Sequence, residues 1–443
     1  MKKGSMRIGK VLLSVLLIAV LTSMTAACGG SGSGSGSDGG ADADGGAKTG
    51  TIVWGVDDSL TGTGAGSGLP SYQGTVLAVE QVNAEGGIQI GDTSYTIQLK
   101  EYDNKSDASE AVSTLTKLLD VDKVHFVIGW GSSTATLAAA QIAMTRQDDV
   151  TMVVGNGRTP MLMVYNTQGN IFRSGTGNVY DPIGIVQYMK EVGCNKTGVI
   201  AMMNDTAYSV SAKQYMEKFE ECGIESVGLE NFEANDTDFN TQVTKLLHAG
   251  ADSILTVGNI IESATIVRTI REQGSDIPIV NFSAGTGSQW LGVCTNEQMN
   301  NCYTTRPWAS AIGATDDGTQ EAYTEAYIAR WNDSPAQADC QAYDDVWIMK
   351  AAYEKAQSTD PLEVRAAMKE LKVSDLDPRC VDAFEALDGD KLFDEFNQAY
   401  APYQCMRWSM EEKTWTLAAV VGRNLGPAAH REYVLEQREK EGL

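Results

Sequence analysis

Short apolar runs alternate along most of the chain with stretches in which apolar residues recur every three or four positions. Runs rich in valine and isoleucine are typical of strands covered on both faces, and the longer spacing is typical of helices with one buried face. The runs predict strands at residues 51–56, 95–102, 124–129, 151–154 and 171–175, and a second series at 198–203, 227–232, 253–257 and 277–281. The intervening stretches predict helices at 72–84, 108–119, 135–144, 181–190, 212–221, 239–249 and 264–273. This alternation predicts an α/β fold with two lobes, each built on a parallel sheet.

The pattern becomes mainly helical from residue 319 onward. Helices are predicted at 319–331, 344–357 and 361–371, followed by closing strands at 407–409 and 414–421. The last helix, at 429–440, is charged and has little apolar face, so we expect it to be peripheral.

The N-terminus has the pattern of an export signal. A basic start leads into an apolar run at residues 11–21, which is too short to span a bilayer, because a spanning helix needs about 20 apolar residues. Residues 1–27 therefore fit a secretory signal peptide. Small residues lead into Cys28, which resembles the signal of bacterial lipoproteins, although a plain signal peptide is the alternative. A lipid on Cys28 and a Gly/Ser-rich tether at residues 28–50 would hold an extracytoplasmic protein at the cell membrane.

Charge and motifs exclude several classes of function. The chain has 34 Lys and Arg against 58 Asp and Glu, a net charge of −24, which argues against binding nucleic acid. The glycines at 62, 64, 66 and 68 do not fit the dinucleotide fingerprint G-x-G-x-x-G. With three histidines and no hydrolase or metalloprotease motif, we expect no enzyme activity, no cofactor and no metal site.

Seven cysteines follow Cys28, and none forms a C-x-x-C pair. A zinc site is therefore not expected, whereas an exported chain permits disulfides. Cys294 with Cys302 is the closest pair, and Cys380 with Cys405 is a second possibility. Their spacing alone does not establish either bond.

Polar loops follow the carboxyl ends of the predicted strands. The clearest lies at residues 130–134, where a buried strand meets the start of a helix with Gly131, Ser132 and Ser133. Unpaired N–H groups and hydroxyls at such a start can bind a small anion such as a carboxylate, although an ordinary Ser/Thr helix cap is the alternative. The other loops, at 60–68, 155–159, 203–208, 258–262 and 282–287, are rich in Gly, Ser, Thr and Asn. Ligands of open α/β sheets bind at this edge, so we expect a small polar solute between the lobes.

From residue 51 to about residue 422 the chain resembles the type I periplasmic binding proteins of branched-chain amino acid and amide transporters. The motifs that carry the resemblance are LTGTGAGSGLPSYQGTVLAVEQVNAEGGI (60–88), YDNKSDASEAV (102–112), VIGWGSST (127–134), IFRSGTGNVYDP (171–182), DFNTQVTKL (238–246) and the ending DEFN…MRW (394–408). The resemblance implies two Rossmann-like lobes joined by three crossover segments and closing on a ligand. One lobe would comprise 51–176 and 307–402, the other 177–306 and 403–425, with 426–443 as a peripheral helix. It also implies a monomer that delivers its ligand to the membrane subunits of an ABC permease.

The resemblance assigns roles to individual residues. Gly131, Ser132 and Ser133 would hold the carboxylate of an amino acid, with Thr159 or Arg158 from the next loop. The family's ammonium-pairing acidic residue has no counterpart in the loop that contains Ser283, and its usual aromatic residue is replaced by Asn259. The full set of candidate ligand-binding residues is Trp130, Gly131, Ser132, Ser133, Asn156, Arg158, Thr159, Tyr180, Asp181, Asp205, Asn259, Glu262 and Ser283.

The missing carboxylate makes a simple leucine-type ligand doubtful, because a buried ammonium needs a charged partner. Asp181, Asp205 or Glu262 could replace it, Arg158 could bind an acid group, and Trp130 could stack on a flat ligand. The alternatives are wall packing for Trp130, a surface ion pair for Arg158, and helix capping for the two acids at 205 and 262. A ligand-sensing module for a membrane signalling partner would have the same fold.

Overall fold

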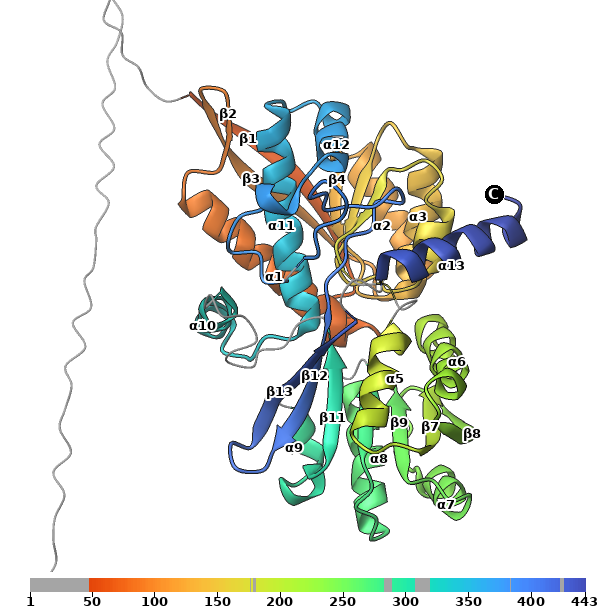
Figure 1. Ribbon diagram of the computed structural model, residues 1–443. Coiled ribbons are helices and arrows are strands. Elements are labelled where there is room, and N and C mark those ends of the chain that lie inside the picture. The colour runs from red at the N-terminus through yellow and green to blue at the C-terminus, as the bar shows by residue number, and fades with distance from the viewer. Residues whose placement is uncertain are drawn as a thin grey trace, which may run out of the picture. The chain divides into compact units, whose positions relative to one another are not determined.

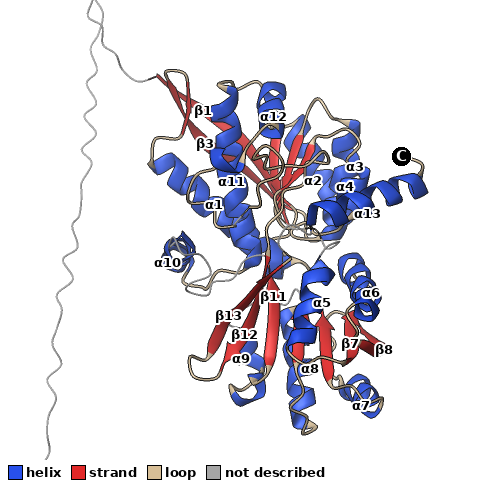
Figure 2. Ribbon diagram, viewed as in Figure 1, coloured by secondary structure: helices blue, strands red, loops and turns tan. Residues whose placement is uncertain are grey.

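Two sheets organise the chain (Figures 1 and 2). The structure is a computed structural model that describes residues 48–175, 177, 181–282, 289–306, 319–382, 384–422 and 426–443. The first sheet has the order β2-β3-β1-β4-β5-β6, and the second has the order β13-β12-β11-β10-β9-β7-β8. The strands of the first sheet are β1 (Lys48–Asp58), β2 (Ile88–Ile90), β3 (Thr93–Asp103), β4 (Phe126–Gly129), β5 (Thr151–Val154) and β6 (Ile171–Arg173). Those of the second are β7 (Lys196–Met202), β8 (Glu225–Phe232), β9 (Ser253–Val257), β10 (Ile279–Phe282), β11 (Cys302–Arg306), β12 (Tyr403–Ser409) and β13 (Thr414–Val421).

Both sheets have parallel cores with antiparallel strands at one edge. In the first sheet only the β2–β3 pair is antiparallel, and in the second only β12 and β13 run against their neighbours. The predicted α/β class with two parallel-sheet cores is therefore confirmed. The long apolar runs of the central strands explain this arrangement, because a parallel strand is buried on both faces.

Helices cover both sheets. Those around the first sheet are α1 (Ala65–Ala84), α2 (Ala108–Asp120), α3 (Ser133–Thr145), α4 (Met161–Tyr165), α10 (Thr319–Trp331), α11 (Gln337–Ala356) and α12 (Pro361–Lys369). Those around the second are α5 (Asp181–Glu191), α6 (Thr206–Glu221), α7 (Asn240–His248), α8 (Ile260–Glu272) and α9 (Gln289–Val293). The chain thus builds the first sheet, passes to the second, returns with α10–α12, and re-enters the second with β12 and β13.

Each sheet separates two apolar clusters, because successive side chains of a strand point to opposite faces. In β4, Phe126 and Ile128 pack under α1 and α11, whereas Val127 packs under α2 and α3. In β7 of the second sheet, Val199 and Ile200 divide between two clusters in the same way. Because the central strands are parallel, the loops that follow them lie at one edge of each sheet, where the site described below is found.

Helix α1 begins at Ala65, although the sequence predicted a glycine-rich loop at 60–68 and a helix only from about residue 72. The glycines instead allow close backbone contacts that a side chain would block. A Cβ on Gly131 would lie 2.6 Å from the Cα of Gly68, and a Cβ on Gly68 would lie 2.3 Å from the carbonyl oxygen of Ser59. The first turn of α1 can therefore lie directly against the loop after β4.

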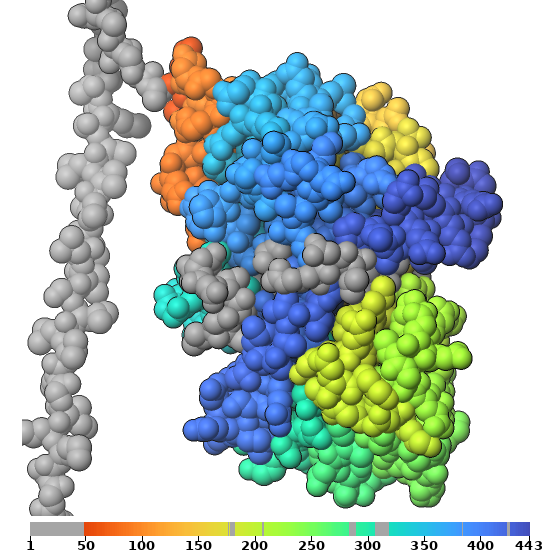
Figure 3. Space-filling model, viewed as in Figure 1, coloured from red at the N-terminus to blue at the C-terminus, as the bar shows by residue number. Residues whose placement is uncertain are grey.

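The last helix, α13 (Gly426–Glu441), was predicted from its low apolar content to be peripheral. In the structure it packs against α4, and its outer face is exposed (Figure 3). Its side chains His430 and Val434 are nevertheless fully buried. Among the described helices none combines the length and apolarity needed to cross a membrane.

All seven cysteines of the described chain are free thiols, so neither of the two candidate disulfides is present. Cys380 packs in the core of the first sheet and Cys405 in the core of the second, which separates that pair. The thiol of Cys294 donates to the carbonyl oxygen of Ala264 at 3.0 Å, whereas Cys302 is buried in β11 beside Arg271.

Candidate functional site

A pocket of about 650 Å³ is lined by loops from the carboxyl ends of strands in both sheets. Its first wall comes from the loops after β1, β3, β4 and β5 and from the start of α11. Its second wall comes from the loops after β7, β8 and β9 and from the start of α9. The first wall presents mainly hydroxyls and glycines, and the second presents carboxylates and amides. The polar residues of the first wall are Thr63, Ser67, Ser106, Ser132, Ser133, Thr134, Asn156, Arg158 and Gln337; those of the second are Asn204, Asp205, Tyr208, Asn235, Asp236, Thr237, Asn259, Glu262, Thr265 and Gln289.

The predicted carboxylate-binding loop lies in the first wall. Gly131, Ser132 and Ser133 all line the pocket, and Ser132 is the N-cap residue of α3. Its side chain makes no capping hydrogen bond, so the hydroxyl is not used as the ordinary helix cap that was the alternative. The N–H of Gly131, in contrast, donates to Asp58 Oδ1 at 2.6 Å. Of the three predicted donor residues, Gly131 therefore already uses its backbone N–H in a hydrogen bond within the protein.

Asp58, which the sequence analysis did not select, positions this loop. The side chain is fully buried at the end of β1 and also accepts from the N–H of Ser59 at 2.8 Å. Burial raises the pKa of Asp58 to about 6, although hydrogen bonds from Ser71 and from the Gly131 amide act in the opposite direction. The only signal in the sequence was the acidic pair at the end of an apolar strand.

Arg158 extends from the first wall toward the second sheet. Its Nη2 donates to the hydroxyl of Tyr403 at 2.6 Å, and its guanidinium carbon lies 5.2 Å from the centre of the Phe282 ring. The residue is only 7% exposed, so it does not lie at the surface as the alternative required. Asn156 from the same loop also lines the pocket, whereas Thr159 is fully buried and does not.

Trp130 was predicted to stack on a flat ligand or to pack in the wall. The structure places it in the core between the first sheet, α2 and α3, fully buried and outside the pocket lining. Its backbone has φ of +69°, a left-handed conformation that turns the chain between β4 and α3. That turn directs the indole into the core and leaves the next residues facing the pocket.

Asp205, Asn259 and Glu262 all lie in the second wall, as predicted. Asp205 Oδ1 accepts from the N–H of Tyr208 at 3.1 Å, the capping bond that was the alternative, and the Tyr208 hydroxyl donates to Asn259 Oδ1 at 3.0 Å. Glu262 Oε1 accepts from the N–H of Asn235 at 2.8 Å. Tyr208, Asn235 and Asp236 also line the second wall, although no sequence pattern singled them out.

Three of the candidate residues cannot be placed. Tyr180 and Ser283 lie outside the described residues, and Asp181 begins α5 but its side chain is also outside the described part. Their assignment to the ligand stays a prediction.

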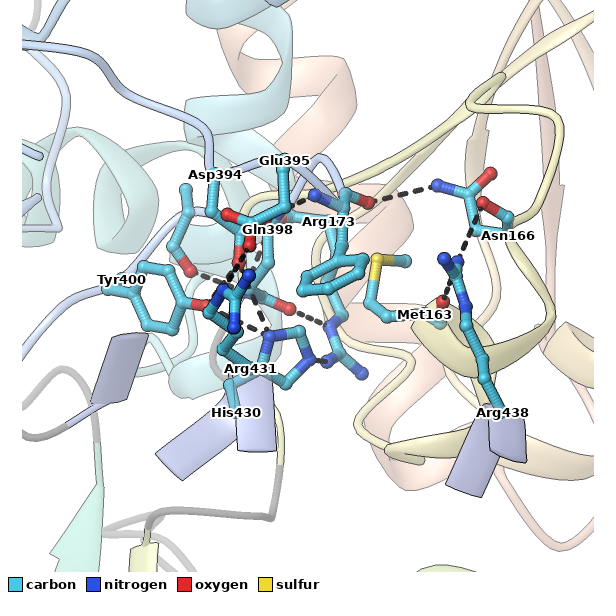
Figure 4. A network of polar contacts seen from close by, with 12 residues as sticks. Met163, Asn166, Arg173, Asp394, Glu395, Gln398, Tyr400, His430, Arg431 and Arg438 are labelled. Atoms are coloured by element: carbon cyan, nitrogen blue, oxygen red, sulfur yellow. Dashed lines mark hydrogen bonds and ion pairs between the residues drawn. The ribbon is translucent and has the colours of Figure 1, made fainter. Parts of the chain in front are cut away.

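A buried polar network braces the first wall from behind (Figure 4). Arg173, fully buried at the end of β6, donates through Nη1 to the carbonyl oxygen of Thr159 at 2.7 Å and through Nε to Gln398 Oε1. Its Nη2 lies 3.4 Å from His430 Nε2, and His430 Nδ1 lies 2.9 Å from the hydroxyl of Tyr400. Burial lowers the pKa of His430, which favours the neutral ring.

Helix α13 also holds the segment that follows the Arg158 loop. Arg438 donates to the carbonyl oxygens of Met163, Val164 and Asn166, at 3.0, 2.9 and 3.2 Å, at the end of α4 (Figure 4). A cation at a helix C-terminus pairs with carbonyls that have no partner within the helix. The last helix therefore contacts the end of α4 through Arg438 and the end of β6 through His430.

Comparison with known families decides the class of protein. The family model described as periplasmic binding protein matches residues 51–413. The chain belongs to the periplasmic binding protein family. The match ends before α13, so the helix that braces the first wall lies outside the part shared with the family model.

Named relatives of this periplasmic binding protein are amino acid-binding proteins. The leucine-, isoleucine-, valine-, threonine- and alanine-binding protein of Pseudomonas aeruginosa is 26% identical over 348 residues, which cover 78% of this chain and 86% of the relative. A Leu/Ile/Val-binding protein homologue of Brucella abortus is 26% identical over 383 residues, covering 83% and 93%.

Solved structures confirm the type I fold. The substrate-binding protein LivJ of Streptococcus pneumoniae, in complex with isoleucine, matches with a TM-score of 0.71 and 24% identity, covering 84% of this chain and 99% of LivJ. A solute-binding protein of R. palustris in complex with benzoate matches with a TM-score of 0.69 and 17% identity, covering 85% and 98%.

Proposed function

We propose that this protein captures a small polar solute, an amino acid or a related amide or carboxylate compound, and delivers it to an ABC importer. The observation that carries the proposal is the pocket of about 650 Å³ with one wall from each sheet. A solute held by both walls would favour closure of the two lobes about the segments that join them, the usual motion of such binding proteins. The amino acid-binding relatives and the isoleucine-bound LivJ structure support this class of ligand.

The first wall offers donors for a carboxylate. Ser132 and Ser133 present hydroxyls at the start of α3, where the helix dipole and unpaired N–H groups favour a negative group. Arg158 adds a guanidinium to the same wall.

We also infer that a lipid on Cys28 holds the protein at the outer face of the cell membrane. The support is the sequence of the N-terminus, with a short apolar run followed by small residues and the cysteine. A Cys28→Ser chain should then move from the membrane fraction to the soluble fraction of cells that express it. Retention in the membrane fraction would count against the anchor.

A thermal-shift screen of amino acids, amides and aromatic acids tests the binding function. A solute at about 100 times its Kd should stabilise the protein by about 2.7 kcal/mol. Ser132→Ala combined with Ser133→Ala should weaken a carboxylate ligand by roughly tenfold, since each lost hydrogen bond is worth about 0.5–1.5 kcal/mol.

Thr145→Ala, at the far end of α3, is the matched control and should leave the affinity unchanged. If no solute stabilises the protein, or if the double variant binds as tightly as the unaltered chain, the assignment of this wall is wrong.

A further inference from the structure

The charge of the second wall restricts the class of ligand. The strand order β9-β7-β8 places the loops after these three strands side by side, and each loop contributes one carboxylate to the pocket. These are Glu262 after β9, Asp205 after β7 and Asp236 after β8. Among the described lining residues the only cationic side chain is Arg158, on the opposite wall. The pocket therefore has an excess of negative charge on one side.

Glu262 is the most buried of the three carboxylates. Its side chain is only 6% exposed, yet it lines the pocket. Oε1 accepts from the N–H of Asn235 at 2.8 Å, and within the described residues Oε2 has no hydrogen bond or ion pair. A ligand that fills the pocket would take the unpaired oxygen out of water, which is costly unless the ligand brings positive charge to the second wall.

The first wall favours a carboxylate on the same ligand. The hydroxyls at the start of α3 and the guanidinium of Arg158 would bind an anionic group. They offer no partner to a compound that carries only positive charge. A neutral α-amino acid has a single ammonium group, which would pair with one of the three carboxylates. A second positive group would pair with another.

We infer that the ligand is a basic α-amino acid, with its carboxylate at the first wall and its two cationic groups at the second. This inference rests on the proposed function and specifies the substrate class of the same pocket. Glu262 pairs with the cationic group of the ligand's side chain, and Asp205 and Asp236 receive the α-ammonium.

Calorimetry with matched pairs of probes separates charge from shape. L-Arginine is compared with L-citrulline, its neutral isostere, and L-lysine with L-norleucine. We expect one of the two basic amino acids to bind at least 30-fold more tightly than its neutral partner. Raising the salt concentration should weaken the basic ligand more than the neutral one.

Glu262→Gln removes the charge while leaving an amide oxygen that accepts from Asn235. The variant should lose at least tenfold in affinity for the basic amino acid and clearly less for the neutral isostere. Glu272→Gln, exposed at the other end of α8, is the matched control and should bind both probes as the unaltered chain does.

Each contrary result has a distinct meaning. Tighter binding of L-leucine or L-norleucine than of L-lysine and L-arginine would overturn the inference and leave the proposed function intact. Equal binding of L-lysine and of putrescine, which lacks a carboxylate, would overturn the role of the first wall. Equal losses for basic and neutral probes in Glu262→Gln would overturn the pairing of Glu262 with the side-chain cation. No stabilisation by any class of solute would remove the proposed function as well.

Discussion

Asp58 illustrates how a single buried carboxylate can position a binding loop. It receives the N–H groups of Ser59 and Gly131, and it thereby joins the end of β1 to the loop between β4 and α3. Ionised, the carboxylate forms charge-assisted hydrogen bonds, which are stronger than those of the protonated group. Burial opposes that ionisation and raises the pKa to about 6.

This raised pKa predicts how stability depends on pH. Between pH 4 and pH 6 the Asp58 carboxyl is mainly ionised in the unfolded chain, where its pKa is near 3.8, and mainly protonated in the folded one. The folded state then binds more protons than the unfolded chain. The contribution of Asp58 to the free energy of unfolding therefore falls as the pH rises through this window, by about 3 kcal/mol in total. Asp58→Asn keeps an oxygen that accepts from Gly131 and should flatten the slope, as measured by urea unfolding at pH 4, 5, 6 and 7.

Asp148→Asn, exposed after α3, is the control and should preserve the slope. If Asp58→Asn and the unaltered protein lose stability in parallel between pH 4 and pH 6, another group is responsible. Asp57 is the neighbouring candidate, because burial raises its pKa to about 8.

At the residue scale the sequence could identify polar loops but not the direction of each side chain. Ser132, Asn259 and Glu262 were found because loops at strand ends gather at one edge of a sheet. Thr159 and Trp130 lie in the same loops but point into the core. That difference depends on local backbone conformation, such as the positive φ of Trp130, which no pattern of residue types specified.

At the scale of elements, the contact between α1 and α11 depends on one glycine. A Cβ on Gly74 would lie 1.9 Å from the carbonyl oxygen of Asp339, a backbone atom that cannot rotate away. Gly74→Ala should therefore destabilise the protein by about 1–3 kcal/mol through overpacking. Gly66→Ala, in the first turns of the same helix, has no atom within 4 Å and should be neutral or stabilise by up to about 1 kcal/mol.

Urea unfolding of the two alanine variants measures both values. Equal effects at the two positions would mean that helix propensity, rather than the close approach of α11, decides the outcome. Ligand affinity is not the readout here, since Gly66 itself lines the pocket.

The elements predicted best were those with long, regular apolar patterns. Most strands of both sheets were found within a few residues, but the short β2 and β11 were missed. The sequence of β11, CYTTR, is half polar although Thr304 and Thr305 are buried. The starts of α6 and α8 were predicted as loops, since Ser, Thr and Asn favour caps and turns, and tertiary packing made them helical. The packing of α13 could not be predicted, because His430 meets Arg173 from a distance of 257 residues along the chain.

At the scale of the whole molecule, the apolar cores of the two sheets are separate. None of the four clusters of buried residues in the described chain combines strands of both sheets. Ala399 packs with the first sheet, and the next residue along the chain, Tyr400, packs with the second. Proteins whose halves have independent cores commonly depart from two-state unfolding.

Differential scanning calorimetry of the ligand-free protein should therefore resolve two transitions. Gly74→Ala acts within the core of the first sheet, so it should lower one transition by several degrees and leave the other in place, because a loss of about 1 kcal/mol shifts the Tm of a unit of 150–250 residues by about 2–4 °C. Gly66→Ala provides the control and should not lower either transition.

A bound solute that contacts both walls would bring the transitions together, since its binding energy is lost when either wall unfolds. A single transition that moves as a whole in Gly74→Ala would instead show that the segments joining the sheets, with the Arg173 network between them, already make the two cores one cooperative unit.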